Sequence, residues 1–264
     1  MSESTAEKPL HTVIAERLID GRSSVGQPKI SPDGSRVAFV VGTASLEMNS
    51  GTSRIWIDDA PVSSGDHDGN PTWSPDGRFL AFTSRRNDQN GPKKGESTLH
   101  IMPITQPGET RQLCSMPDGL GDLAWSPDGS TIAFTSRTQD DRYTNESVAW
   151  QAPRKVERFF SRLNGEDWVF DRPQHIYAIA ANGTGIPRNL TPGEFQHGSP
   201  AWLPDSSGLV ISAQRHDTWD TDLAEDLYFV PSDADTNQDG IRCLTAHDGT
   251  FALPCVSPDG SSVA

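Results

Sequence analysis

The sequence has few cysteines, no long apolar run and little positive charge. Its 264 residues include 3 cysteines, an odd number in a long chain, which favours a reducing compartment over a disulfide scaffold. No apolar run approaches the roughly 20 residues of a membrane span. Residues 1–10 lack the basic start and apolar run of a secretory signal. These absences predict a cytoplasmic protein with no membrane partner.

Acidic residues outnumber basic ones in the chain as a whole. Lys and Arg total 22, whereas Asp and Glu total 36, giving a formal net charge of −14. A surface of that sign repels polyanions instead of gathering them. The charge therefore predicts no nucleic-acid partner and is mainly a source of solubility.

Several familiar catalytic motifs are absent from the sequence as well. The pattern G-x-S-x-G, which places a nucleophilic serine on a strand-to-helix turn, has no match. The phosphate-binding patterns G-x-x-x-x-G-K-[ST] and G-x-G-x-x-G do not occur either. The sequence predicts no cofactor and assigns no catalytic residue among these 264 residues.

What the sequence does contain is a repeated turn, Ser-Pro-Asp-Gly. Copies begin at Ser31, Ser74, Ser126 and Ser257, and a degenerate copy, Leu-Pro-Asp-Ser, begins at Leu203. Proline suits the second position of a type I turn, Ser and Asp side chains bond nearby backbone, and glycine suits the fourth position. Apolar segments such as 123–125 and 132–134 flank the turns, so each copy predicts a hairpin of two buried strands.

A second hairpin lies upstream of the later turns. Its apolar first strand is visible at residues 99–102, 175–179 and 226–230. Four short strands per repeat, recurring at intervals of 43, 52, 77 and 54 residues, are typical of β-propeller blades. We predict an all-β partial β-propeller of about four and a half four-stranded blades out of seven. Residues 12–20 have helical spacing and predict a short N-terminal helix.

The last Ser-Pro-Asp-Gly turn lies close to the end of the sequence, which predicts that the final blade is incomplete. Residues 261–264 align with the start of the second strand in the earlier blades. A propeller protects its edges by radial repetition, so a stop inside a strand leaves backbone groups unpaired. We therefore expect residues 1–264 to be one incomplete propeller domain.

The interval of 77 residues contains an insertion at residues 138–173. Within it, Val156–Leu163 could form a short amphipathic helix that residues 164–167 then break. One interpretation is a surface loop that covers an edge or a neighbouring blade. The other is a segment at the mouth of a functional cavity, because long ordered insertions are often functional.

A weak metal-binding pattern lies in the outer turn at residues 235–240. Asp235, Asn237 and Asp239 match the first half of a calcium loop, in which oxygen ligands cluster around a glycine turn. The twelfth position is Ala246 instead of the bidentate Glu. An ordinary acidic turn is the favoured interpretation, and a calcium site is the weaker one.

Three features together resemble the N-terminal propeller of the prolyl oligopeptidase family of serine peptidases, in particular its acylaminoacyl-peptidase and dipeptidyl-aminopeptidase-like branch. They are the repeated A-W-S-P-D-G-x-x-x-A-F turns, the Leu-Thr pairs at 190–191 and 244–245, and the insertion segment 158–168 that leads into 172–177. The resemblance spans essentially the whole chain. It implies a complete protein with an α/β-hydrolase domain carrying Ser, Asp and His, which this chain lacks, so no catalytic residue can be transferred and the chain itself is expected to be inactive.

The resemblance also implies a role in gating. A propeller that caps a hydrolase domain excludes folded proteins, admits short peptides and contributes loops that touch the substrate. Charged side chains of the insertion are the candidates for such contacts, because charges suit peptide termini. They are Glu157, Arg158, Arg162, Glu166 and Asp167.

Two alternatives remain open. The turn motif is shared with TolB-like binding propellers, which present a partner site at the central channel without catalysis. A propeller with its own active site, built from acidic residues that line the channel, is the third possibility. A hydrolase domain encoded after residue 264 would favour the peptidase, and further blades alone would favour the binder.

Overall fold

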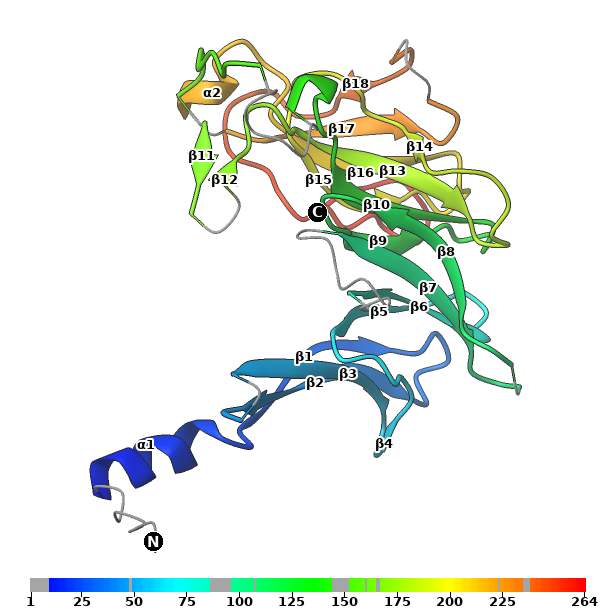
Figure 1. Ribbon diagram of the computed structural model, residues 1–264. Helices are drawn as coiled ribbons and strands as arrows, with labels where there is room; N and C mark the ends of the chain where they lie inside the picture. Colours follow the sequence, from blue (N-terminus) through cyan, green and yellow to red (C-terminus); the bar gives the residue numbers. More distant parts are fainter. Residues whose placement is uncertain are drawn as a thin grey trace, which may run out of the picture.

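The structure is a computed structural model that describes residues 10–47, 49–85, 96–106, 108–143, 152–159, 161–164, 167–222, 224–234 and 238–264. These residues form four antiparallel sheets of four strands each, which follow one another as blades (Figure 1). A helix, α1 (Leu10–Ile19), precedes the first sheet and confirms the predicted N-terminal helix. Among the described residues, no helix is long and apolar enough to span a membrane.

Each blade is an up-and-down sheet whose strands lie in chain order. Blade 1 contains β1 (Ser23–Ile30), β2 (Val37–Ser45), β3 (Ser50–Ile57) and β4 (Ala60–Pro61); blade 2 contains β5 (Asp68–Trp73), β6 (Phe79–Ser84), β7 (Ser97–Pro103) and β8 (Arg111–Met116); blade 3 contains β9 (Gly121–Trp125), β10 (Thr131–Arg137), β13 (Gln174–Ala180) and β14 (Arg188–Asn189); blade 4 contains β15 (His197–Trp202), β16 (Gly208–Ala213), β17 (Asp226–Pro231) and β18 (Arg242–Cys243). The first strands of successive blades contact one another and form the inner wall of the propeller. A bridge between Val256 and Val263 begins a fifth repeat.

The core consists of three clusters, one at each interface between blades. The second strand of blades 1 to 3 alternates large and small residues, as in Leu80-Ala81-Phe82 of β6. Leu80 and Phe82 pack toward blade 1 together with Ala38, whereas Ala81 packs toward blade 3 against Ile132 and Phe134. Because the inner sheets are buried on both faces, their strands are apolar runs without a polar face.

Tryptophans at the ends of the inner strands join neighbouring blades. Trp73 Nε1 donates to the Lys29 carbonyl at 2.9 Å, and Trp125 Nε1 donates to the Thr72 carbonyl at 3.2 Å. Trp202 in the next blade donates in the same way across 3.0 Å. The aromatic residue of the repeat thus buries its ring and satisfies its polar group at one blade interface.

The inner strands also share a bulge four residues before each turn. A residue in the left-handed region occupies it in every described blade: Gln27, Asn70, Asp122 and Ser199, with φ values of 54°, 51°, 43° and 51°. Non-glycine residues rarely adopt such angles, and a bulge bends its strand and increases its twist. The bulge backbone of blade 2 donates from Asn70 N to Gln27 Oε1 of blade 1 at 2.7 Å. These bulges therefore help to set the geometry of the inner wall.

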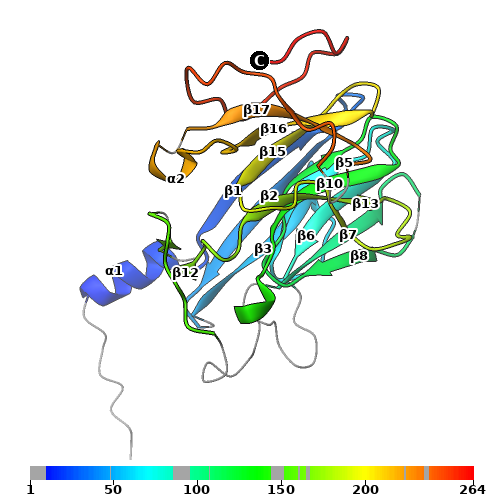
Figure 2. The same cartoon turned by 90° about the horizontal axis from the view of Figure 1, so that it is seen from above.

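The two ends of the blades differ sharply. One end, the turn face, carries the Ser-Pro-Asp-Gly turns and the outer hairpin turns. The other end, the loop face, carries the links between the second and third strands of each blade, including the insertion at 138–173. The elements α1, β12 (Asp167–Trp168) and α2 (Trp219–Asp222) lie on this side in both views (Figures 1 and 2).

The predicted helix at Val156–Leu163 is wrong. Residues 156–159 are irregular, and Arg162–Leu163 forms strand β11, which pairs with β12 in a small hairpin. An isolated helix of this length is marginal in water. Here Arg158 and the Phe159 amide make contacts with other parts of the chain instead, as described below. The described helical part of the insertion is a single 3-10 turn, η1 (Asp141–Tyr143).

Candidate functional site

A partly buried ion pair closes the insertion on itself, and a second ion pair fixes it to the loop face. Arg154 Nε donates to Asp171 Oδ2 at 3.0 Å, and the Asp171 side chain is 2% exposed. The Arg154 guanidinium also lies 4.6 Å from the Tyr143 ring centroid and 5.6 Å from that of Trp168. A second ion pair, from Arg172 Nη1 to Asp118 Oδ1 at 2.6 Å, joins the insertion to the link between blades 2 and 3. These contacts hold the excursion as an ordered structure.

The tip of the insertion rests on blade 4. The Arg158 guanidinium stacks 4.7 Å from the Trp219 ring centroid and pairs with Glu194. The Phe159 amide donates to Asp220 Oδ2 at 2.6 Å. The Phe159 side chain nevertheless projects into solvent and is 81% exposed. The insertion thereby bridges blades 3 and 4 and presents an aromatic side chain at the rim of the loop face.

Two buried histidines lie beneath this rim, one from blade 3 and one from blade 4. His175 Nε2 lies 2.9 Å from the Gly193 carbonyl, which can only accept, so this nitrogen carries the proton. His197 Nδ1 lies 3.2 Å from the Gln174 carbonyl, and its Nε2 accepts from Arg215 Nη1 at 3.0 Å. Both rings are therefore held in neutral tautomers, with their centroids 5.6 Å apart.

The pKa values of the two histidines agree with neutral rings. Burial, reinforced by the nearby Arg215 charge, lowers the pKa of His175 to about 4. Burial together with the charges of His175 and Arg215 lowers the pKa of His197 well below its usual value. Burial also lowers the pKa of Arg215. The cluster stabilises the interface between blades 3 and 4 only while the two imidazoles stay neutral.

A separate polar hollow of about 230 Å³ lies at the loop-face end of β5. Asp68 is fully buried there, and its carboxylate accepts from Ser84 Oγ at 2.5 Å and from the Gly65 amide at 2.9 Å. Ser97 also lines the hollow; it is buried, and its Oγ has no hydrogen-bond partner among the described residues. The hollow has the size and polarity to hold ordered water or a small polar group.

The residues predicted to touch a substrate are not gathered at one place. Arg158 is held against Trp219 as described, and Arg162 lies over the Trp168 ring at 5.6 Å. Glu157 is exposed and pairs with Lys155. Asp167 contributes its backbone to β12, whereas Glu166 lies outside the described residues. The structure thus brings Arg158 to the rim, gives Arg162 a role within the hairpin, and leaves substrate contact by any of them a prediction.

The predicted calcium turn is described only in part. Asp239 lies in the turn that precedes β18 on the turn face, whereas Asp235 and Asn237 lie outside the described residues. Calcium binding at this turn stays a prediction.

Sequence reasoning missed the cluster of His175, His197 and Arg215. These residues come from two blades and a loop, so no local spacing joins them. Their only shared feature along the chain is that each lies close to the loop-face end of a strand or follows one directly.

Comparison with known proteins identifies the fold of this chain. No protein-family model matches the chain. The fold is that of a β-propeller: it is similar to Pyrococcus horikoshii acylaminoacyl peptidase with a TM-score of 0.65 at 15% sequence identity, over 88% of this chain and 34% of that one. It is also similar to a putative TolB from Agrobacterium tumefaciens, with a TM-score of 0.56 at 18% identity, over 91% of this chain and 69% of that one.

Sequence similarity relates this β-propeller to a peptidase. The chain is 32% identical over 219 residues to the uncharacterized peptidase YuxL of Bacillus subtilis (strain 168), an alignment that covers 78% of this chain. The aligned part of this chain spans 32% of the length of YuxL. The predicted resemblance to the propeller region of this group of peptidases is thereby confirmed, as are the all-β class and the four-stranded blades.

Proposed function

We propose that these residues form the substrate-gating propeller of a serine peptidase that acts on short peptides, of the acylaminoacyl-peptidase or dipeptidyl-aminopeptidase-like kind. The observation that carries the proposal is the similarity to the peptidase YuxL over 78% of the chain. In this proposal the nucleophile, acid and base belong to an α/β-hydrolase domain outside these 264 residues.

The loop face is the side that we assign to the substrate. The insertion is braced internally by the Arg154–Asp171 pair and anchored by the Arg172–Asp118 pair, so its rim residues are preorganised and lose little entropy on binding. Exposed Phe159 offers an apolar surface, and the half-buried Arg158 offers a positive charge that suits a peptide carboxylate. A rigid rim of this kind would select by size and orient the peptide before hydrolysis.

Activity measurements on the purified 264-residue chain provide the first test. We expect neither hydrolysis of an acyl-peptide reporter nor labelling by a fluorophosphonate probe, because the sequence contains no nucleophile motif. Specific labelling of one serine in this chain would overturn the proposal.

A non-catalytic binding propeller is the second candidate. The similarity to TolB favours it, because this chain spans 69% of that protein. Expression of the complete gene product separates the two candidates. Peptide hydrolysis with fluorophosphonate labelling supports the peptidase, whereas a complete product that lacks both supports the binder.

A cytoplasmic location belongs to the same proposal. Cys114, Cys243 and Cys255 are free thiols, as is usual in a reducing compartment. Cell fractionation tests this location, and recovery of the protein from the cell envelope would contradict it.

A further inference from the structure

One cluster of side chains in blade 4 has the composition of a transition-metal site. Asp226 begins β17, Cys243 ends β18, and His247 lies in the segment that follows β18. A carboxylate oxygen, the thiol sulfur and a ring nitrogen of these three residues all lie within 4.8 Å of one another. Within the ranges that the structure describes, this is the one group of three such residues that meets that distance.

The register of the sheet explains why the three residues meet. Tyr228 pairs with Cys243 in blade 4 just as Tyr177 pairs with Asn189 in blade 3. By this register, Asp226, Cys243 and His247 occupy the positions that His175, Asn189 and Gly193 occupy in blade 3. There, His175 Nε2 meets the Gly193 carbonyl at 2.9 Å, and Asn189 Nδ2 lies 3.0 Å from His175 Nδ1. The blade architecture therefore brings these positions together.

The two blades use the shared positions differently. Blade 3 fills them with a histidine, an amide and a backbone carbonyl, which satisfy one another by hydrogen bonds. Blade 4 fills them with a carboxylate, a thiol and an imidazole. Thiolate and imidazole are preferred by zinc and related transition metals, whereas calcium and magnesium require oxygen ligands.

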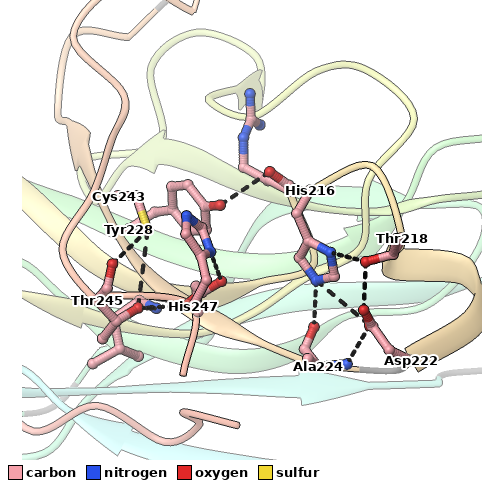
Figure 3. Close-up of polar contacts among 11 residues, drawn as sticks. His216, Thr218, Asp222, Ala224, Tyr228, Cys243, Thr245 and His247 are labelled. Carbon is pink, nitrogen blue, oxygen red and sulfur yellow. Dashed lines mark hydrogen bonds and ion pairs between the residues drawn. The ribbon is translucent and has the colours of Figure 1, made fainter. Parts of the chain in front are cut away.

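The surroundings also fit a bound ion. Thr245 Oγ1 donates to Asp226 Oδ1 at 2.6 Å and orients the carboxylate, as a neighbour of a metal ligand commonly does. The Asp226 side chain is 2% exposed, whereas the His247 side chain is 55% exposed and pairs with it. Figure 3 shows Cys243, Thr245 and His247 converging beside the Tyr228 ring. The site thus has a buried anchor and an open side toward solvent.

The separation of the ligand atoms requires a small adjustment. Tetrahedral zinc with bonds of about 2.0–2.3 Å places its ligand atoms roughly 3.3–3.8 Å apart. The observed limit of 4.8 Å exceeds this by about 1 Å. The exposed His247 side chain can move by that amount, and the Cys243 thiol, which donates to the Thr245 carbonyl at 3.4 Å, can release its proton to solvent.

We infer that Asp226, Cys243 and His247 form a binding site for a zinc-type transition-metal ion, with a fourth position open to water. The ion would join β17, β18 and the segment after β18, and would stabilise the end of blade 4. This inference does not depend on the peptidase proposal, because it concerns the chain's own side chains.

Cobalt is the probe for the test, because Co²⁺ occupies zinc sites and a thiolate ligand gives it a charge-transfer band in the near ultraviolet. Addition of Co²⁺ to the reduced 264-residue chain is expected to produce this band at one equivalent, and Zn²⁺ is expected to abolish it by displacement. Zn²⁺ should also raise the unfolding temperature of the chain.

Variants identify the ligands. The band should be lost in Cys243→Ser and in His247→Ala, two changes at half-buried or exposed positions that leave the buried Asp226 in place. Cys255→Ser is the matched control, because it removes an exposed thiol elsewhere, and it should keep the band. The inference is wrong if the unmodified chain gives no band, or if the band survives in Cys243→Ser.

Discussion

The turn face and the loop face of this propeller are stabilised in different ways. On the turn face, each intact turn is a local network: Ser74 Oγ donates to Asp76 Oδ1 at 2.6 Å and accepts from the Phe79 amide at 2.9 Å. The same bonds recur at Ser31, Ser126 and Ser257. On the loop face, contacts such as Arg172 with Asp118 and Phe159 with Asp220 join residues 54 and 61 positions apart in the sequence. Hydrogen bonds within each turn therefore stabilise the turn face. Buried charged groups and neutral histidines stabilise the loop face.

The difference indicates where function can vary. A turn stabilised by its own residues leaves little freedom for new chemistry, whereas long links can change without disturbing the blades. The insertion and the link that contains α2 both lie on the loop face. We therefore expect substitutions on the turn face to change stability alone, and exposed positions on the loop face to change peptide recognition.

The largest effect should come from the buried ion pair of the loop face. Arg154→Met removes the partner of the Asp171 carboxylate, which is 2% exposed, and should cost about 3 kcal/mol of unfolding free energy. Arg142→Met is the matched control, because Arg142 is exposed and pairs with Asp140 on the surface, and it should cost less than about 1 kcal/mol. Urea denaturation measures both, and equal losses would show that the anchor contributes no more than a surface pair.

The two faces should also respond to acid in separate windows. The pKa of His175 and the pKa of His197 are depressed by burial, so the folded chain resists protonation that the unfolded chain accepts below about pH 6.5. Stability should fall from there toward pH 4, by up to about 1.4 kcal/mol per pH unit for each proton. His175→Gln should flatten this dependence in urea titrations across that range, and an unchanged slope would contradict the assignment.

The turn aspartates should lose their contribution in the same direction, as the pH falls, but in a lower pH range. Hydrogen bonds from Ser31 and Ser35 lower the pKa of Asp33 to about 2, and hydrogen bonds from Ser74 and the Arg78 amide lower the pKa of Asp76. Their contribution is present above the ordinary carboxyl pKa and is lost only as the pH falls through the lowered value. A loss of the turn contribution already at pH 5 would contradict this separation.

A smaller effect should come from a single turn hydroxyl. Ser74→Ala leaves the Phe79 amide without its acceptor and removes one bond to Asp76, at a cost of about 1–2 kcal/mol. Thermal unfolding of this variant measures the cost. A change smaller than that of an exposed serine substitution would show that the turn network is not a source of stability.

The smallest effect should be a gain. The turn of blade 4 has Leu203 where the others have serine, and Asp205 there bonds only to Ser207 in the corresponding network. Leu203→Ser supplies the missing hydroxyl and should add about 0.5 kcal/mol. A decrease in unfolding temperature would show that the packing of the leucine matters more than the hydrogen bond.

The sequence predicted the part of the structure that repeats. The Ser-Pro-Asp-Gly turns and the strand at residues 226–230 were confirmed because turn chemistry and alternation are local properties. The helix at 156–163 was wrong, because the helical spacing of Val156 and Phe159 was not supported by a surface on which a helix could pack. Arg158 binds Trp219 instead.

The candidate sites depended on contacts between blades, which spacing alone does not reveal. His175 and His197 meet only because blades 3 and 4 stack, and Cys243 meets Asp226 only through the register of β17 and β18. Alignment of repeat positions between blades was the signal that could have found the cluster of Asp226, Cys243 and His247. It becomes usable once the strand pairing is known.

Kinetics of the complete gene product test the central claim, that the loop face serves the substrate and the turn face serves stability. Phe159→Ala and Arg158→Ala should each lower kcat/KM for a short acyl-peptide about ten-fold, a loss of about 1.4 kcal/mol of transition-state stabilisation. Ser74→Ala on the turn face should leave this value unchanged at a temperature where the variant is folded. Equal kinetics for all three variants and the unmodified protein, or a complete product that hydrolyses no peptide, would contradict the account.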